Sequence, residues 1–553
     1  MASPSSAEHS GTSGLEDIPA TLAWQDVTPA KLRGGPVGLL QPGAMVFRNA
    51  RRFPTKLAYV LDERRLTWRD VDQTTDALAH GLQAHGVKPK DRVAVIGDNS
   101  IEFVQAQFAA MKAGAAVVLV NPALTPNQMA SQLNHARVSL VIAKSAVRDT
   151  LREVESTLLA STFMTWGDAE PGGDDATVAS LIEEYQASGS FSLAEIDPSD
   201  PALILYTSGT TGVPKGAVNT YYDLTIKLLT NSLSAEYKES EVGLVLTPLC
   251  MAGTQVLSFL NYAMLGMTCV ICPAFDPVRV LDLIENEAVS TMLAVPSMTT
   301  ALVNEPSVAT RDLSSVKRIY SAGAPLPREI FDRLRSLGLD VCEIYGSSET
   351  GGGVVISARE KDERPDSVGR PKVGHEVKVV DDTGAEVAPG EIGEFLMRGD
   401  PVTAGYYEQP DLHAEAFEGG WFHTGDLGYR DDDGFFYVID RKKDMIVTGG
   451  TNVYPRDVEE VLFALPGVIE AAVVGLPHDR WGEAVTAFVV TEENSPITGE
   501  VVIAECKKQL AGFQVPKRVL IVNTLPKTAM GKLSKVDLRA TYGNTYHETS
   551  EDN

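Results

Sequence analysis

A segment rich in glycine and hydroxyl side chains could bind phosphate groups. Residues 206–216 read YTSGTTGVPKG and directly follow the apolar run ALIL. A glycine-rich loop lets backbone N–H groups approach a phosphate chain closely, while Ser and Thr hydroxyls add donors and Lys215 adds a cation. A bare Ser/Thr/Gly run is often a linker, but this one is joined to an expected core strand and ends in P-K-G. Because no glycine directly precedes Lys215, it is not a Walker A loop.

The same segment resembles the phosphate-loop signature of the adenylate-forming superfamily, which includes acyl-CoA synthetases, luciferases and the adenylation domains of peptide synthetases. Further segments resemble this superfamily in the same order, so the resemblance extends from about Leu40 to Leu538. The whole set is most similar to the acyl-CoA synthetases. Each motif alone is a weak signal, whereas the joint order and spacing are specific.

Two segments resemble the parts of the family that hold the adenosine. Residues 321–326 (SAGAPL) resemble the adenine-side loop, and residues 343–350 (EIYGSSET) resemble the segment that stacks the adenine and reaches the α-phosphate and magnesium. Tyr345 offers an aromatic face, Ser348 a hydroxyl and Glu349 a hard oxygen ligand for Mg²⁺. The resemblance therefore assigns Ser348 and Glu349 to catalysis, and Glu349 also to the metal.

Three further positions complete the nucleotide site that the resemblance implies. Asp426 stands where the family holds both ribose hydroxyls, a natural role for a carboxylate that can accept two hydrogen bonds. Arg441 resembles the family's arginine near the ribose, and Lys532 in PKTAMGKLSK resembles the catalytic lysine. The residues that the resemblance assigns to ATP or AMP are Thr207, Ser208, Gly209, Thr210, Thr211, Gly212, Lys215, Gly323, Ala324, Pro325, Glu343, Ile344, Tyr345, Gly346, Ser347, Ser348, Asp426, Arg441 and Lys532.

The resemblance also implies a second reaction at the same site, with coenzyme A as the acceptor. Lys443 falls at the family's hinge position, and Gly449 and Gly450 fall in the loop that lines the pantetheine tunnel, where missing side chains let a thin arm pass. A carboxylic acid would first attack the α-phosphate of Mg·ATP, with Lys532, Ser348 and the phosphate loop stabilising the developing charge. Rotation of the C-terminal domain about Lys443 would then let the thiol of coenzyme A attack the acyl-adenylate.

Three residues are expected to line the acid pocket: Tyr221, Met251 and Gly323. Tyr221 and Met251 stand where the family often has histidine. Met251 replaces a polar group by flexible apolar volume, which favours a bulky hydrophobic acid. Because these two departures lie on the acid side, they also predict that adenylation is the weaker half-reaction.

Three functions are therefore compared. The leading hypothesis is a complete ATP-dependent acid–CoA ligase that activates a hydrophobic carboxylic acid. The alternative is an enzyme that mainly performs the thioester half-reaction on a preformed acyl-adenylate. A non-catalytic adenylate-binding protein is disfavoured because Lys532, Glu349 and Asp426 are all present.

The elements that would position these residues alternate along the chain. Residues 91–122 predict a βαβ unit, residues 125–136 a helix capped by Thr125, and SLVIAKS another strand. The expected strands in MLAVPS, KRIYSAG and VCEIYG each end in small or polar residues. This alternation indicates sheets covered on both faces, with ligands at the carboxyl ends of the strands.

The chain is too long for one hydrophobic core, because single cores stop growing near roughly 250–300 residues and this chain has 553. We expect an α/β fold with a large N-terminal domain over residues 26–442, built from doubly wound mixed sheets and a β-rich subdomain at about 370–440. A small mobile α+β C-terminal domain is expected over residues 443–553, after the hinge at Lys443. Residues 1–25 are rich in Ser, Gly and Pro and are expected to be disordered.

The composition excludes several other functions. A net charge of −26 disfavours binding to nucleic acid or to an anionic membrane surface. No run reaches the roughly 18 apolar residues of a membrane span, and the first twenty residues lack the features of a signal peptide. Cys269 and Cys272 form a C-x-x-C inside an apolar run, which predicts a buried strand. A cytoplasmic enzyme is expected, whereas the sequence leaves open the identity of the acid and whether the protein is a monomer or a homodimer.

Overall fold

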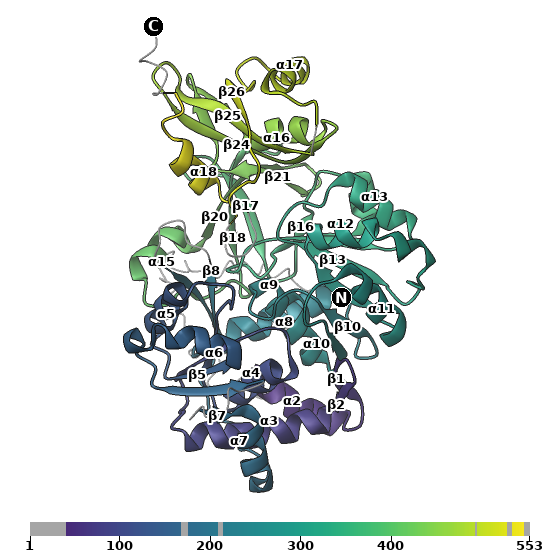
Figure 1. The fold of residues 1–553 in the computed structure, drawn as a ribbon, viewed down its shortest axis with the longest axis vertical. Coiled ribbons are helices and arrows are strands. Elements are labelled where there is room, and N and C mark those ends of the chain that lie inside the picture. Colours follow the sequence, from purple (N-terminus) through teal and green to yellow (C-terminus); the bar gives the residue numbers. More distant parts are fainter. Residues whose placement is uncertain (1–39, 168–174, 208–213, 493–494, 528–532, 547–553) are drawn as a thin grey trace, which may run out of the picture.

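The computed structural model describes residues 40–167, 175–207, 214–492, 495–527 and 533–546. An eight-stranded and a nine-stranded sheet build the large lower part of the molecule, and a smaller sheet with its helices builds the upper part (Figure 1). A four-stranded sheet lies between them in this view (Figure 1). The fold is therefore mixed α/β with a smaller C-terminal α+β domain, as the sequence predicts.

The eight-stranded sheet carries the expected phosphate loop. Six of its strands are parallel, and the last two at one edge, β9 and β19, each run antiparallel to their neighbour. In sheet order the strands are β19 (Gly405–Tyr406), β9 (Lys215–Thr220), β8 (Pro201–Thr207), β4 (Ala116–Leu119), β3 (Arg92–Ile96), β5 (Leu140–Lys144), β6 (Thr162–Trp166) and β7 (Ala176–Thr177).

The nine-stranded sheet carries the two expected adenosine segments. Its centre is parallel, and its edges are closed by antiparallel strands on both sides. In sheet order the strands are β16 (Arg370–Pro371), β15 (Val354–Ile356), β14 (Val341–Tyr345), β13 (Arg318–Ala322), β12 (Thr291–Ala294), β10 (Val242–Val245), β11 (Thr268–Ile271), β1 (Leu57–Leu61) and β2 (Arg64–Thr67).

Helices cover both faces of each large sheet, because both sheets have apolar residues on both faces. One core lies between the two sheets and includes helices from both halves, and two further cores lie on the outer faces. The helices of this region are α2 (Pro42–Arg52), α3 (Trp68–Ala84), α4 (Ile101–Lys112), α5 (Pro126–His135), α6 (Ser145–Arg152), α7 (Val178–Tyr185), α8 (Tyr221–Ser234), α9 (Ala252–Thr254), the π-helical turn η5 (Gln255–Phe259), α10 (Leu260–Leu265), α11 (Pro277–Glu287), α12 (Pro296–Asn304), α13 (Arg328–Ser336) and α14 (Ala358–Glu363).

Two smaller sheets follow in sequence. The four-stranded sheet is antiparallel, and the C-terminal sheet has β25 at its centre, with β26 parallel to it. Their elements are β17 (Glu376–Val380), β18 (Gly393–Arg398), α15 (Pro410–Ala416), β20 (Phe422–Arg430), β21 (Phe436–Arg441), β22 (Ile446–Thr448), β23 (Thr451–Val453), α16 (Pro455–Phe463), β24 (Val468–His478), β25 (Gly482–Thr491), α17 (Gly499–Gln509), β26 (Arg518–Ile521) and α18 (Lys535–Tyr542).

Local signals in the sequence are confirmed where the structure can test them. The predicted βαβ unit is β3–α4–β4, and the Thr125 side chain caps α5 through a capping box with Gln128. Cys269 and Cys272 are buried and free, in and just after β11. The expectation for residues 1–25 lies outside the described residues.

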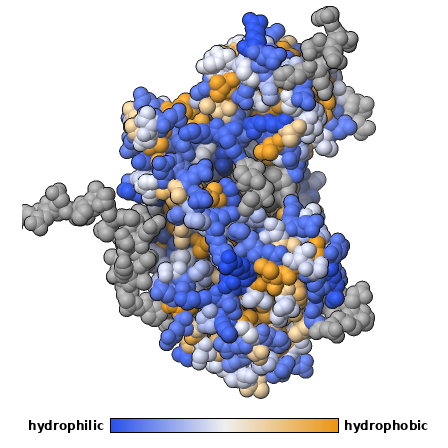
Figure 2. Space-filling model, turned by 90° about the vertical axis from the view of Figure 1, so that its left-hand side faces the viewer, coloured by the Kyte–Doolittle hydropathy of each residue, from blue (hydrophilic) through white to orange (hydrophobic). Residues whose placement is uncertain are grey.

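The lengths of the described helices and the hydropathy of one face can be compared with what a membrane requires. Within the described ranges, no helix combines the length and the apolar character that a bilayer crossing needs. Figure 2 shows one face of the molecule on which hydrophilic residues dominate and hydrophobic residues form only small, scattered patches. This face therefore presents no extended apolar surface of the kind that marks a large docking site.

Candidate functional site

Three residues expected around the adenosine meet in space although they come from three strands. The Tyr345 hydroxyl, at the end of β14, donates to Asp426 Oδ2 at 2.5 Å. Arg441 Nε lies 2.6 Å from Asp426 Oδ1, and the two residues are paired across β20 and β21. Burial raises the pKa of the Asp426 carboxyl, whereas Arg441 and the Tyr345 hydrogen bond act in the opposite direction. The carboxylate is thus oriented by a cation and a hydroxyl, in a position to accept hydrogen bonds from a diol.

The backbone after β14 turns too tightly for a side chain. A Cβ atom at Gly346 would lie 2.6 Å from Thr350 Oγ1 and 2.7 Å from Gly352 Cα, so only glycine fits there. The turn is held by Ser347 N, which donates to Thr350 Oγ1 at 2.9 Å. The Ser347 hydroxyl is buried and has no hydrogen-bond partner within the described residues. A buried hydroxyl of this kind fits an anionic ligand, such as a phosphate group.

The adenine-side loop lies at the end of the neighbouring parallel strand. Gly323 follows β13 with a φ of +91°, in the left-handed region that glycine adopts without strain. Gly323, Ala324 and Pro325 are all exposed. Because β13 and β14 are parallel and adjacent, this loop and the turn at Gly346 lie at the same edge of the sheet, where α/β folds bind ligands.

Glu349, the expected metal ligand, contacts β19, the edge strand that pairs with the strand after the expected phosphate loop. Tyr406 Oη donates to Glu349 Oε1 at 2.7 Å, and Thr403 N donates to Glu349 O at 2.8 Å. Tyr406 belongs to β19, where it pairs with Ala217 of β9. Burial and the Glu349 carboxylate raise the pKa of the Tyr406 hydroxyl, which therefore stays a donor. The sequence reasoning missed Tyr406, because no local pattern links it to Glu349.

The donor set around Glu349 fits Mg²⁺ bound through a nucleotide. Mg²⁺ in such sites takes one or two carboxylates and completes its octahedron with phosphate oxygens and water. The described parts of the chain hold no cluster of three or more His, Cys, Asp or Glu side chains that could form an all-protein cage. A single carboxylate such as Glu349, near the strands that flank the expected phosphate loop, matches this requirement.

The two ends of the phosphate loop lie side by side. Thr207 ends β8, Lys215 begins β9, and the two are antiparallel partners in the sheet. The expected loop residues Ser208, Gly209, Thr210, Thr211 and Gly212 lie outside the described residues, as does Lys532. The hydroxyl of Tyr206, just before the loop, lies 2.8 Å from His135 Nδ1, a contact that the sequence did not predict.

The expected hinge region carries several positive charges. Lys443 is exposed, in the turn that joins β21 of the four-stranded sheet to β22 of the C-terminal sheet. Partial desolvation lowers the pKa of Lys443, and so do Arg441, Arg539 and Lys215, although Asp444 acts in the opposite direction. Arg539 of α18 pairs with Asp444 at 2.9 Å. The turn therefore lies close to Lys215 of β9, to Arg441 of β21 and to Arg539 of α18.

The expected pantetheine loop forms a hairpin turn in the C-terminal sheet. Gly449 and Gly450 join β22 to β23, have φ values of +58° and +81°, and are exposed. Gly449 N donates to Trp481 O at 2.8 Å. No described hydrogen bond or ion pair joins this turn to Asp426 or to Tyr345.

The surroundings of three expected site residues, Tyr221, Glu343 and Ile344, differ from the expectation. Tyr221 was expected to line the acid pocket, but its side chain is 0% exposed within the core between the sheets, at the first turn of α8. It lines neither of two small cavities in this structure, and its buried hydroxyl has no hydrogen-bond partner within the described residues. Glu343 is held in a buried ion pair with Lys361 Nζ at 2.9 Å. Ile344 points to the opposite face of the sheet from Tyr345, into a small cavity. Met251 is half-buried just before α9.

Comparison with known protein families gives two matches that together span most of the chain. The AMP-binding enzyme family matches residues 46–407, and the AMP-binding enzyme C-terminal domain matches residues 457–532. Feruloyl-CoA synthase from an Amycolatopsis species is 34% identical over 502 residues, covering 91% of this chain and 99% of its own length. The long-chain-fatty-acid–CoA ligase FadD13 of Mycobacterium tuberculosis is 32% identical over 513 residues, with coverages of 91% and 99%.

Solved structures show the same fold. ATP-bound MatB from Rhodopseudomonas palustris superposes with a TM-score of 0.83 and 28% identity, covering 92% of this chain and 100% of that chain. The o-succinylbenzoate coenzyme A synthetase MenE from Bacillus subtilis, in complex with ATP and a magnesium ion, gives a TM-score of 0.78 and 29% identity, with coverages of 90% and 98%.

Proposed function

Because this chain belongs to the AMP-binding enzyme family, we propose that it activates a largely hydrophobic carboxylic acid as an acyl-adenylate and passes the acyl group to coenzyme A by rotating its C-terminal domain. Its reaction class is that of an ATP-dependent, AMP-forming acid–CoA ligase that uses Mg²⁺. The observation that carries the proposal is the cluster of Tyr345, Asp426 and Arg441 at the carboxyl end of β14. A buried carboxylate held by these two partners is well suited to the ribose hydroxyls of an adenosine.

The roles proposed for the first half-reaction combine this geometry with the motifs of the sequence. With the ribose on Asp426, the phosphates would extend towards the ends of β8 and β9, where Lys215 begins its strand. Glu349 would hold Mg²⁺, which neutralises charge on the phosphates when bound. Ser347, Ser348 and Lys532 would donate to the α-phosphate as the carboxylate of the substrate attacks it and pyrophosphate leaves.

The second half-reaction requires a different set of groups at the same place. The Gly449–Gly450 turn is exposed and carries no side chain that would obstruct a pantetheine arm. We therefore assign residues 26–442 to a large domain and residues 443–553 to a domain that rotates about Lys443. Cations gather at this junction, so departure of the pyrophosphate anion would raise their mutual repulsion and favour the rotation.

Several observations support a hydrophobic acid. The similar enzymes include a feruloyl-CoA synthase and long-chain-fatty-acid–CoA ligases, whose named acids are mostly apolar. Met251 adds apolar volume beside the expected acid pocket. Gly323 and Met251 are kept as pocket residues in this proposal, whereas Tyr221 is not. The cytoplasm is the proposed location, because ATP and coenzyme A are available there.

Replacement of Lys443 by proline is expected to spare adenylate formation and to abolish thioester formation. Proline fixes φ near roughly −65°, which removes the backbone rotation that the hinge needs. Among the described hydrogen bonds none uses Lys443 N–H, so the substitution breaks no known contact of the turn. Pyrophosphate release and acyl-CoA formation, measured separately, give the result.

The matched control is Lys443→Ala, which removes the same side chain but keeps the backbone free. If Lys443→Pro forms thioester as fast as Lys443→Ala does, rotation at this residue is not part of the reaction. Loss of both half-reactions in Lys443→Pro alone would equally contradict the assignment, because the first half-reaction does not need the rotation.

A second candidate function is favoured by Met251, which offers only a weak acceptor where the family often has histidine. In that case the enzyme would mainly perform the thioester half-reaction on a preformed acyl-adenylate. Missing donors near a developing charge lower the rate far more than they weaken binding. Supplying the adenylate directly separates this candidate from a complete ligase.

A further inference from the structure

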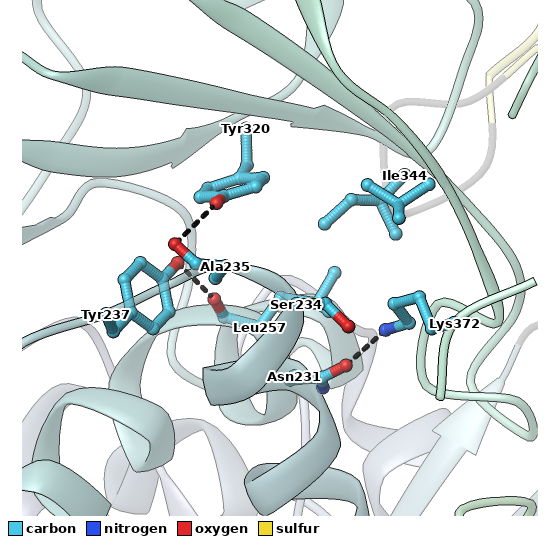
Figure 3. Close-up of a pocket in the computed structure, with 9 residues that line it drawn as sticks. Asn231, Ser234, Ala235, Tyr237, Leu257, Tyr320, Ile344 and Lys372 are labelled. Atoms are coloured by element: carbon cyan, nitrogen blue, oxygen red, sulfur yellow. Dashed lines mark hydrogen bonds between the residues drawn. The ribbon is translucent and has the colours of Figure 1, made fainter. Parts of the chain in front are cut away.

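A small cavity lies beside Ile344, which points to the opposite face of β14 from Tyr345. Figure 3 shows residues that line this cavity. The cavity is bounded by the last turn of α8, by η5 and by β13, β14 and β15, and it is just large enough for one water molecule. The residues that line it are Asn231, Ser234, Ala235, Tyr237, Leu257, Tyr320, Ile344, Val355 and Lys372.

The cavity lies directly behind the proposed reaction site. Tyr320 and Ile344 line it, on adjacent parallel strands; Tyr320 comes just before the expected adenine-side loop, and Ile344 lies next to Tyr345 in the second adenosine segment. Because successive side chains of a strand point to opposite faces, Tyr345 lies on the nucleotide side of the sheet and Ile344 on the cavity side. The two faces share the carboxyl ends of the strands. An acid whose carboxylate reacts at these ends could therefore extend its body along the cavity side.

Lys372 is an unexpected group in such a place. It is only 5% exposed, whereas lysine is almost never buried without a partner of opposite charge. Its Nζ donates to Asn231 Oδ1 and, at 3.4 Å, to Gly351 O (Figure 3 shows the first contact). Within the described residues no carboxylate pairs with it, and the pKa of Lys372 is lowered to about 7 by burial and by the nearby Lys227.

The two tyrosine hydroxyls of the cavity already donate to the main chain, and the Ser234 side chain also lines it. Tyr237 Oη donates to Leu257 O at 3.1 Å, and Tyr320 Oη donates to Ala235 O at 3.2 Å. In its protonated form Lys372 has three N–H donors and makes two contacts here, so one donor remains for an acceptor that enters the cavity, and such an acceptor would itself favour the protonated form. A buried donor of this kind favours an oxygen acceptor and disfavours an apolar group in the same position.

We propose that Lys372 marks the far end of the acid-binding site and selects acids whose distal end carries an oxygen acceptor, such as a phenolic hydroxyl or a second carboxylate. This inference rests on the proposed function. It adds that the acid is apolar along its length but polar at its tip, because apolar and aromatic side chains form most of the cavity wall and Lys372 supplies the donor.

The test uses pairs of acids that differ only at the tip: para-hydroxycinnamic against cinnamic acid, and ω-hydroxyoctanoic against octanoic acid. We measure kcat/KM for pyrophosphate release with each. The wild-type enzyme is expected to favour the oxygen-tipped member of at least one pair by about tenfold or more, as expected for a hydrogen bond to a charged donor. Lys372→Met is expected to reduce this ratio to about one, mainly by losing activity on the oxygen-tipped acid.

The matched control is Lys227→Met. Lys227 is a second buried amine, which donates to Asn219 Oδ1 at 2.5 Å and does not line the cavity. Because Lys227 lowers the pKa of Lys372, its loss favours the protonated Lys372, and this variant is expected to keep or raise the wild-type ratio. A wild-type preference for the apolar tip in both pairs, or an equal loss on both members in Lys372→Met, would overturn the inference while leaving the ligase activity in place. If no acid releases pyrophosphate with the wild-type enzyme, the proposed function fails, and this inference fails with it.

Discussion

Replacement of Lys532 by alanine is expected to lower the rate of adenylate formation by about 10²–10³-fold, the usual cost of losing one preorganised donor at a developing charge. Thioester formation from a supplied acyl-adenylate is expected to be largely spared, because the charge that Lys532 stabilises develops on the α-phosphate only in the first half-reaction. The residue comes from the sequence motif alone, since it lies outside the described residues. Pyrophosphate release and coenzyme A consumption, each with its own substrate, measure the two steps.

Lys527→Ala is the matched control for this prediction. Lys527 belongs to the same motif but pairs with Glu470 on the surface, and a half-exposed pair contributes little to stability or activity. Both half-reactions should therefore continue at the wild-type rate in the control. An equal loss of the two half-reactions in Lys532→Ala would refute the assignment of Lys532 to the first step.

The second large effect is expected at Glu349. Glu349→Gln keeps the shape of the side chain and an oxygen that can accept from Tyr406, but it removes the negative charge that binds Mg²⁺. Adenylate formation is expected to fall by about 10²-fold or more at a fixed Mg²⁺ concentration, and the Mg²⁺ concentration needed for half-maximal rate is expected to rise. Titration of the rate with Mg²⁺ measures both quantities.

Tyr406→Phe provides a graded comparison. Tyr406 touches Glu349 but is not expected to touch the metal, so its loss should misplace the carboxylate without removing the charge. Its effect is expected to be smaller than that of Glu349→Gln and in the same direction. If Glu349→Gln shows the Mg²⁺ dependence of the wild-type enzyme, Glu349 is not the metal ligand.

Local patterns in the sequence predicted the regular elements well. The strands of the βαβ unit and the cap at Thr125 depend on residues close together in the chain, and the structure has them where expected. The resemblance identified Tyr345, Asp426 and Arg441 as parts of one site. Composition could not have done so, because Tyr345 and Asp426 are 81 residues apart and meet only through the packing of two sheets.

The features that sequence reasoning missed depend on burial. Tyr221 was expected to be polar and functional, but it is the first residue of a helix packed between two sheets. Lys372 lies in the polar run GRPKVGHE, and a lysine in such a run is expected on the surface. In the structure it is buried, and its amine donates to Gly351 O. The Tyr406–Glu349 contact likewise joins an edge strand to a loop 57 residues away. No local signal encodes these contacts.

An assay of the wild-type enzyme with a panel of hydrophobic acids decides between a complete ligase and an enzyme of the second half-reaction. Formation of acyl-CoA is measured once with Mg·ATP and the free acid, and once with the matching synthetic acyl-adenylate. We expect the preferred acid to give acyl-CoA in both arms, with AMP and pyrophosphate released in step with the thioester in the first arm. Thioester formation from the adenylate alone, for every acid in the panel, would contradict a complete ligase and leave an enzyme of the second half-reaction.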